Sequence, residues 1–468
     1  MCEYLGGNTP EDITCQYLIA GDVNQSYHRE PRPISELELM WQQGLDISRS
    51  LWDRESLIFH LDIEYVNFDF PIEPYEDPER IFDLQRPVEL AVEAVLLDYG
   101  ITPLHLLSGR GHHFVWRVGQ DSNAFAGLAE LGHVPASLEK LNAGRHRPCG
   151  EAVSPRLGAA FAGVGLVIEY LAHRIKQEAV ESSTLPVELT AVEVGPGPNG
   201  REMISIDISE YGDPLSARVI RVPFSLYLKP LQQRSLLGEE KVKRLPAVFL
   251  IPLHDMDSPQ GIRVMHDVGL VVELAGRSTS RIPDQSQSTE NLIRSYEKSA
   301  LKKFHDWFYS EEHEPAEKWP ETYDRTPLEV LPLCVCDTLE KPNDLLLKPA
   351  NIQRVARVLM AVGWHPRHIA GLIRSKFERA HAWGGLWKGY DAAARADFYT
   401  RIFAGLFVTG LDDLVAFNCQ SVKEAKLYCL SNCPFNLEHY QKSLLNRRKY
   451  ERLAGRPFNG LFLPEEHL

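Results

Sequence analysis

The first half of the chain alternates between short apolar runs typical of strands and longer segments of helical spacing. Residues 56–65 are rich in strand-forming residues and predict a strand. Apolar positions at helical spacing predict a helix over 87–99, which Gly100 can end because glycine readily adopts the left-handed conformation of a C-cap. The same patterns predict helices near 34–51 and over 157–177, and strands over 104–107, 113–118, 187–194 and 203–208. Because both hairpins and crossovers join these elements, we expect an α+β fold rather than a doubly wound parallel sheet.

The second half of the chain is mostly helical in pattern. A stretch rich in serine and glutamine, 276–288, predicts a linker, and a helix is expected over 290–309. Further on, apolar residues at helical spacing predict one helix that ends near Gly363 and a second that begins at Pro366. The predicted organisation is an N-terminal extension (1–55), an α+β core (56–275), a linker with a helix (276–325) and a helical domain (326–468).

The charge of the chain is unevenly distributed. A length of 468 residues favours two or three domains. The net charge of −14 at first argues against a nucleic-acid partner, because duplex-binding domains are usually basic. Residues 331–468, however, hold 19 basic against 13 acidic side chains, whereas residues 1–330 hold 31 against 51. The whole-chain charge therefore does not exclude local contacts with phosphates.

Two carboxylates, Asp62 and Glu64, lie one residue apart within the predicted strand 56–65. Residues i and i+2 of a strand point to the same face, so their charges repel unless a cation lies between them. Hard divalent ions such as Mg²⁺ bind oxygen ligands of this kind; a solvated strand edge is the structural alternative. Asp207 is a third candidate, because a single acid in an apolar strand is rarely buried without a partner. Its alternative role is to cap a turn.

Two further segments offer donors for an anion. A glycine-rich turn begins at Ser108, carries Arg110 and leads to His113. Glycines let backbone N–H groups approach an anion closely, although most such turns are only turns. The segment 218–229 is predicted to be extended, which would place two cations and a hydroxyl on one face, as a triphosphate requires. These three side chains are Arg221, Ser225 and Lys229, and a solvated edge strand is the alternative.

In this order the motifs resemble the archaeo-eukaryotic primase superfamily over about residues 55–230. They are Asp62-Ile-Glu64, Ser108-Gly-Arg-Gly-His-His113, Ile206-Asp207 and Arg221-Val-Pro-Phe-Ser225. The resemblance implies an RRM-like catalytic core that transfers nucleotides by two-metal catalysis with Mg²⁺ or Mn²⁺. It implies three metal ligands, Asp62, Glu64 and Asp207. It also implies six contacts to the incoming nucleotide: Ser108, Arg110, His113, Arg221, Ser225 and Lys229. The family often has a histidine where this chain has Tyr227.

The resemblance thus implies a DNA primase or primase-polymerase that makes primers from NTP or dNTP. Its partners would be a single-stranded DNA template and a helicase or other replication or repair proteins, at the nucleoid. One alternative is a catalytically inactive nucleic-acid-binding module of the same fold that acts in replication initiation, and another is a nuclease with the same carboxylates. A second pair of acids, Asp255 and Asp257, lies outside the ordered motifs and ranks below Asp62 and Glu64.

Five of the eight cysteines fall after residue 330. The N-terminus has no pattern of a signal peptide, and no run of about 18 apolar residues is present, so we expect no membrane partner and a reducing cytoplasm. Clustered cysteines there indicate metal binding more often than disulfides. Cys419, Cys429 and Cys433, with Cys334 or Cys336, supply four thiolates for Zn²⁺ or an iron–sulfur cluster. The spacing is unlike that of a zinc ribbon, and buried free cysteines are the alternative.

Leu331-Pro-Leu-Cys334 and the helices that follow resemble the C-terminal region of the primase large subunit. There a Pro-Pro-Cys segment begins a helical domain whose four distant cysteines hold a four-iron cluster; this chain has Leu333 at the second proline. The resemblance implies a [4Fe–4S] cluster on Cys334, Cys419, Cys429 and Cys433, with Zn²⁺ as the alternative. Basic residues of this region suit template or primer phosphates, with a solvated helical face as the alternative. They are Arg354, Arg357, Arg367, Arg374, Lys376, Arg447, Arg448 and Lys449.

Overall fold

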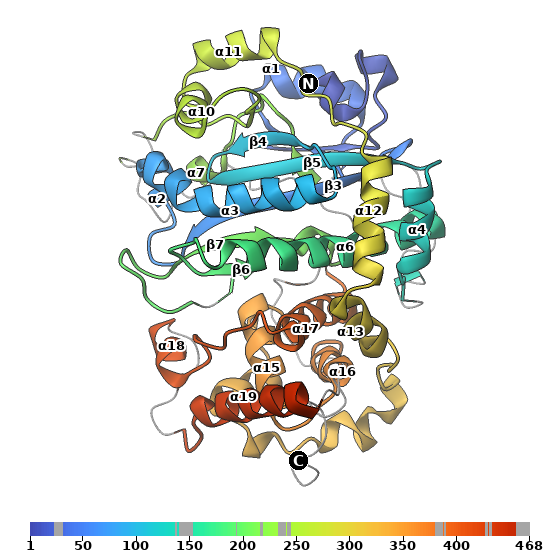
Figure 1. The fold of residues 1–468 in the computed structure, drawn as a ribbon, viewed down its shortest axis with the longest axis vertical. Coiled ribbons are helices and arrows are strands. Elements are labelled where there is room, and N and C mark those ends of the chain that lie inside the picture. The colour runs from blue at the N-terminus through green and yellow to red at the C-terminus, as the bar shows by residue number, and fades with distance from the viewer. Residues whose placement is uncertain are drawn as a thin grey trace. The chain divides into compact units, whose positions relative to one another are not determined.

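The structure, a computed structural model, separates into two compact units. It describes residues 1–22, 31–135, 138–139, 153–192, 194–215, 219–232, 240, 245–379, 387, 390–425, 429 and 433–454. Residues 1–188 and 202–295 form one unit, here called the α+β unit, and residues 189–201 and 296–468 form the other, called the helical unit. The predicted α+β class is confirmed, since a sheet with covering helices is joined to a mostly helical part (Figure 1).

A six-stranded sheet forms the centre of the α+β unit. Its order is β6 (Val187–Leu189), β7 (Glu202–Asp207), β3 (Ser56–Asn67), β5 (Gly111–Gly119), β4 (Leu104–Ser108) and β9 (Ile251–Pro252). Strand β3 pairs antiparallel with both β5 and β7, and β4 pairs antiparallel with β5 and β9. The long strand β3 is therefore central, with a neighbour along each edge.

Helices α3 (Pro78–Asp98) and α6 (Pro155–Ala179) lie side by side across one face of this sheet, and α12 (Ser286–Glu297) extends beside them (Figure 1). Phe59 and Trp116 stack on this face with ring centroids 4.9 Å apart, and the Trp116 indole donates to Thr289 of α12 at 3.3 Å. Helix α3 is longer than predicted. It begins at Pro78, after the N-cap Asp77, and continues through the proline at which the sequence prediction began.

Helix α6 is long and apolar enough to cross a membrane by length and composition alone. Of its most apolar window, 78% is buried inside the structure. It packs against α3 and against α4 (Asn123–Leu131). These contacts bury its apolar surface in the core of the α+β unit.

A three-stranded antiparallel sheet also belongs to the α+β unit, with the order β1 (Leu18–Gly21), β2 (Asp46–Ser50) and β8 (Val219–Arg221). The predicted helix near 34–51 is correct only in its first part, because α1 (Leu37–Gln42) is followed by β2. The predicted extension over 218–229 ends at Arg221, because a turn with Phe224 at a φ of 66° follows. Within the described residues, the unit also contains α2 (Glu73–Glu76), α7 (Lys229–Gln232), α10 (Ser258–Met265) and α11 (Val268–Arg277).

The helical unit is built around α17 (Ala392–Thr409), which packs against α13 (Ala300–Phe308), α15 (Pro349–Ala361) and α16 (Pro366–Phe377). The predicted helix over 290–309 is two helices, because Ser299 caps α13 by accepting a hydrogen bond from the Lys302 N–H. The predicted end near Gly363 and start at Pro366 are confirmed. The described part of this unit also contains α14 (Leu333–Glu340), α18 (Cys419–Glu424) and α19 (Leu437–Ala454).

Candidate functional site

Strand register brings three carboxylates of the α+β unit together. Asp62 on β3 lies opposite Asp207 on β7, and Glu64 follows two residues later on the same face of β3. One carboxylate oxygen from each of the three residues lies within 4.8 Å of the others. Acids 145 positions apart in the chain, which the sequence singled out separately, thus share one site.

Asp62 lies at the centre of this group. Its Oδ1 atom is buried and has no hydrogen-bond partner among the residues that the structure describes. Burial, together with the negative charges of Glu64, Asp207 and Glu210, raises the pKa of Asp62 well above its usual value. An all-oxygen donor set of three carboxylates suits a hard divalent ion. These residues therefore fit the Mg²⁺ or Mn²⁺ that the primase resemblance implies.

Glu64 differs from Asp62 because cations surround it. Arg110 forms an ion pair with the Glu64 carboxylate through Nη2. Burial would raise the pKa of Glu64, but the charges of Arg110, Lys229 and Arg221 outweigh burial and lower it to about 2. Three of the predicted nucleotide contacts thus act on one carboxylate from three elements: the β4–β5 turn, α7 and β8.

The turn between β4 and β5 holds Arg110 against β3. The Tyr65 N–H donates to the Arg110 carbonyl at 3.1 Å, and the Ser108 hydroxyl donates to the Gly111 carbonyl at 3.2 Å. A Cβ atom at Gly111 would lie 1.8 Å from the carbonyl oxygen of Ile63. The glycine is therefore needed for the close approach of the turn to strand β3.

His113 of β5 lies opposite Asp62, on the side of β3 away from β7. Its Nε2 atom is 3.6 Å from Asp62 Oδ1, and its buried Nδ1 atom has no hydrogen-bond partner within the described part of the chain. Burial, together with electrostatic interactions with His60 and Arg221, lowers the pKa of His113 well below its usual value. The imidazole is therefore neutral near pH 7, and it can donate a hydrogen bond without adding charge.

Three residues that the sequence analysis missed support this histidine. His60 Nδ1 lies 2.5 Å from Glu210 Oε1, and the His60 ring packs edge-on against His113 with centroids 4.7 Å apart. The Tyr211 hydroxyl accepts from the His60 N–H and donates to the His60 carbonyl, each at 2.8 Å. Glu210 and Tyr211 follow closely after Asp207, yet no local pattern indicates a contact with a strand 150 positions earlier.

Arg221, at the end of β8, is held by a partner that the sequence analysis also missed. Its Nε and Nη2 atoms donate to the two carboxylate oxygens of Asp46 at 2.7 and 2.9 Å. Its guanidinium lies 4.1 Å from the centre of the Tyr227 ring. The Ser225 side chain is 1% exposed, and its hydroxyl donates to a backbone carbonyl of the same turn at 2.8 Å. Lys229 begins α7 instead of continuing a strand.

Four cysteines of the helical unit line one small pocket: Cys334, Cys419, Cys429 and Cys433. They come from α14, from the first turn of α18 and from the segment before α19. Apolar side chains complete the wall, namely those of Pro332, Val422, Phe435 and Leu437. All described cysteines are free thiols. The structure thus brings together the thiolates that the sequence proposed as a set.

Backbone N–H groups point at two of these sulfur atoms. The Leu333 N–H donates to Cys433 Sγ at 3.5 Å, and the Leu437 N–H donates to Cys419 Sγ at 3.4 Å. Hydrogen bonds of this kind stabilise thiolate ligands and tune the potential of a cluster. Burial raises the pKa of Cys334 to about 12, so a metal ion or cluster must displace its proton on binding.

Cys336 lies outside this pocket. Residues two apart on a helix point in different directions, and Cys336 interacts with Glu340 on α14. Burial and the hydrogen bond with Glu340 raise the pKa of Cys336 to about 12. Of the two candidates left open by the sequence, Cys334 is the one beside the other three cysteines.

Several basic residues of the helical unit are engaged internally. Arg357 forms a buried bidentate pair with Asp412 at 3.0 and 2.7 Å, and Arg367 pairs with Asp397 at 2.8 Å. Arg447, 3% exposed, donates to a backbone carbonyl at 3.1 Å. These arginines stabilise the packing between helices, and they form neither a solvated face nor an exposed surface for phosphates.

The chain therefore holds a candidate divalent-metal site surrounded by cations in one unit and a candidate thiolate site in the other. Comparisons with protein-family models, with curated proteins and with solved structures found no match. The chain's own residues and motifs must therefore carry any assignment of function.

Proposed function

We propose that the chain is a DNA primase or primase-polymerase, a template-dependent nucleotidyltransferase. The observation that carries this proposal is the group of three carboxylates on the sheet, together with Arg110, Arg221 and Lys229, whose positive charges act on Glu64. Carboxylates that bind divalent ions, next to cations that attract phosphates, are the two parts that nucleotidyl transfer from a triphosphate requires.

The topology of the α+β unit supports the proposal. The succession β3-α3-β4-β5-α6-β7 forms a sheet segment of order β7-β3-β5-β4, with both helices on one face. We infer that this succession, with α2, α4 and β6 as additions, corresponds to the β-α-β-β-α-β arrangement of RRM-like folds. The carboxylates and His113 project from the face opposite these helices, because they alternate with residues such as Phe59 and Trp116 that pack beneath α12.

Each side chain then has a specific role in the proposed reaction. Divalent ions on Asp62, Glu64 and Asp207 would lower the pKa of an attacking 3′-hydroxyl and stabilise the charge of the leaving pyrophosphate. The Arg110 guanidinium, now paired with Glu64, lies where it can turn to a phosphate oxygen of the incoming nucleotide. Neutral His113 can donate a hydrogen bond to the same phosphates.

We also propose that Cys334, Cys419, Cys429 and Cys433 hold a four-iron cluster. A single Zn²⁺ ion binds sulfur at about 2.3 Å, which places its thiolates less than about 4 Å apart. Among the described residues, the groups whose ligand atoms lie within 4.8 Å of one another do not include these cysteines. A larger cluster suits this wider spacing, with donors from the N–H groups of Leu333 and Leu437.

Primer synthesis tests the proposed activity directly. Full-length protein is incubated with single-stranded DNA, NTP or dNTP, and Mg²⁺ or Mn²⁺. We expect a template-dependent product ladder, which Asp62→Asn and Asp207→Asn abolish. Asp255→Asn is the matched control, because Asp255 is exposed and outside the site. Binding of DNA without incorporation would favour the inactive module, and shortening of the template would favour the nuclease.

A further inference from the structure

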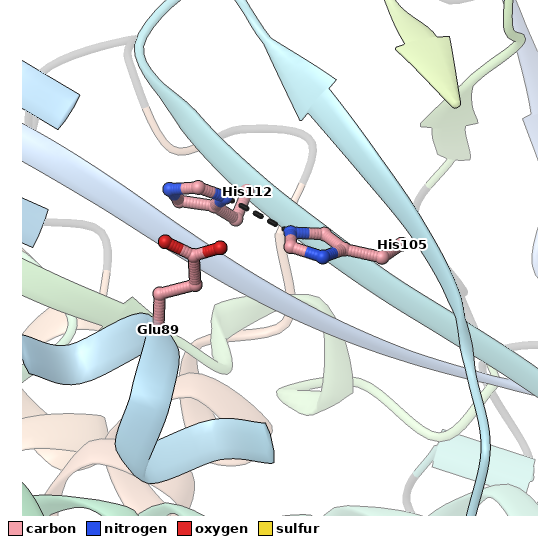
Figure 2. Close-up of side chains that lie close together, drawn as sticks. All are labelled: Glu89, His105 and His112. Carbon is pink, nitrogen blue, oxygen red and sulfur yellow. Dashed lines mark hydrogen bonds between the residues drawn. The ribbon is translucent and has the colours of Figure 1, made fainter. Parts of the chain in front are cut away.

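A second group of potential metal ligands lies on the helix-covered face of the same sheet. Figure 2 shows Glu89 of α3 with its carboxylate directed toward His105 of β4 and His112 of β5. His112 lies opposite Leu107, and His105 precedes Leu107 by two residues, so both histidines project to one face. One nitrogen from each histidine and one Glu89 oxygen lie within 4.8 Å of one another.

The group is buried and incompletely hydrogen-bonded. His112 is fully buried and Glu89 is 1% exposed. His105 Nε2 and His112 Nδ1 are 2.9 Å apart, and they share one proton as a hydrogen bond (Figure 2). Within the described part of the chain, His112 Nε2 and Glu89 Oε2 have no hydrogen-bond partner. Buried polar atoms without partners destabilise a fold, so the unpartnered Glu89 oxygen, beside two histidines, points to a missing ligand.

We propose that Glu89, His105 and His112 bind one divalent transition-metal ion of the Zn²⁺ class. Two imidazole nitrogens and one carboxylate oxygen are a common protein donor set for Zn²⁺, with a fourth position for water. The ion binds the two facing nitrogens, His105 Nε2 and His112 Nδ1, and the proton between them moves to the other nitrogen of its own ring, so both imidazoles stay neutral and no proton is released. Arg86 binds the other Glu89 oxygen at 2.8 Å and so orients the carboxylate, as outer partners do in metal sites.

This site differs in chemistry and place from the carboxylate site. Adjacent residues of a strand point to opposite faces, so His112 faces α3 whereas His113 faces Asp62. The nitrogen ligands favour a transition metal over Mg²⁺. The ion would join α3 to the β4–β5 hairpin, whose turn carries Arg110. The site therefore acts as a structural clamp, and it does not depend on the proposed primase activity.

Zinc binding by the full-length protein tests the proposal. Zn²⁺ is titrated against a chromophoric chelator in excess Mg²⁺, and wild type is compared with His105→Gln and Glu89→Gln. Zinc bound at the cysteines or at Asp62 is common to all three proteins and cancels in the comparison. We expect wild type to bind one equivalent more than either variant. His266→Gln is the matched control, because His266 is a half-buried histidine of the same unit outside the group.

Thermal unfolding provides a second readout. Zn²⁺ should raise the Tm of wild type and of His266→Gln by at least about 3 °C more than the Tm of the two ligand variants. Circular dichroism without added metal checks that each variant is folded, and Glu89→Gln, which only removes a charge, replaces His105→Gln if the latter unfolds. Equal zinc stoichiometry in wild type and folded Glu89→Gln would show a hydrogen-bonded histidine pair and overturn the proposal.

Discussion

Asp62 and Asp207 occupy directly opposed positions on the antiparallel strands β3 and β7. Like charges in opposed positions of a sheet repel, so without a cation the two residues destabilise the strand pair that the hydrophobic core holds together. This repulsion at the centre of the sheet should have measurable effects on stability and activity.

Asp62→Asn should stabilise the metal-free protein while it removes activity. The substitution eliminates a buried carboxylate whose pKa is raised by burial and by Glu64 and Asp207. We expect a higher Tm in EDTA and a loss of nucleotide incorporation of about 100-fold or more. Differential scanning calorimetry and primer assays on one preparation measure both. A variant that is less stable than wild type in EDTA would contradict this account of Asp62.

The advantage of Asp62→Asn should depend on pH. The folded pKa of Asp62 is raised well above the unfolded value of 3.8. Ionisation of Asp62 therefore lowers the stability of the fold as pH rises from about 3.8 through the folded pKa, and it has no effect below pH 3.8. The gain in Tm should be largest at neutral pH and should shrink as pH falls toward about 4.

Glu64→Gln should change the Tm of the metal-free protein in the opposite direction, and this loss of Tm should also depend on pH. The folded pKa of Glu64 is lowered from 4.5 to about 2, so its stabilisation is present above pH 4.5 and is lost as pH falls toward 2. The loss of Tm caused by Glu64→Gln should therefore be largest at neutral pH and should diminish in acid. Melting curves of both variants in EDTA from pH 2 to 8 compare the two signs, and parallel pH profiles would refute the assignment.

Gly111→Ala should disrupt the turn that carries Arg110. Its methyl group would meet the Ile63 carbonyl oxygen at 1.8 Å, so the turn must move away from β3. Overpacking of this kind costs about 1–3 kcal/mol in the free energy of unfolding. Gly276→Ala is the control, because open space surrounds Gly276. Urea denaturation distinguishes the two, and equal midpoints would be incompatible with this packing.

Removal of one member of the Arg221–Asp46 pair should be strongly destabilising. Both side chains are at least nine-tenths buried, so Arg221→Met leaves the Asp46 charge uncompensated. We expect a loss of about 3–5 kcal/mol by urea denaturation. The exposed pair Arg277–Glu273 offers a control, and Arg277→Met should cost less than about 1 kcal/mol. The double variant of Arg221 and Asp46 should lose less than the sum of the single variants.

Cys334→Ser and Cys336→Ser should show which of these two neighbouring cysteines binds the cluster. Cys334 lines the pocket with the other three cysteines, whereas Cys336 interacts with Glu340. After anaerobic purification we expect about four iron and four sulfide per chain in wild type and in Cys336→Ser, and a large loss in Cys334→Ser. Zinc in place of iron in all three proteins would support the alternative ion, and iron retained by Cys334→Ser would exclude Cys334 as a ligand.

Local patterns predicted the elements that hold the carboxylates. Apolar runs rich in strand-forming residues located the strand of Asp62 and that of Asp207, and the order of motifs indicated that they belong together. The same approach failed after Arg221, because a turn with Phe224 at positive φ depends on tertiary packing more than on local propensity. Side chains such as Asp46 and Glu210 were missed for a related reason: each contacts a residue at least 150 positions away.

The two candidate ligand histidines on the helix-covered face illustrate a different limit. The primase resemblance assigns a role to His113 and none to its neighbour His112, and His105 and Glu89 carry no recognisable spacing. Only the pairing of β4 with β5 and the passage of α3 across them bring the three side chains within reach of one ion. A group of ligands formed by three elements cannot be recognised from the sequence of any one of these elements.

Residues 189–201 belong to the helical unit, although the chain on both sides of them belongs to the α+β unit. The chain leaves the α+β unit after residue 188, returns at residue 202 and only then forms the strand that carries Asp207. No single protease cut can release the two units as separate pieces. An N-terminal fragment that stops before the return would lack the third carboxylate, so during synthesis on the ribosome the site remains incomplete until well after the first five strands have emerged.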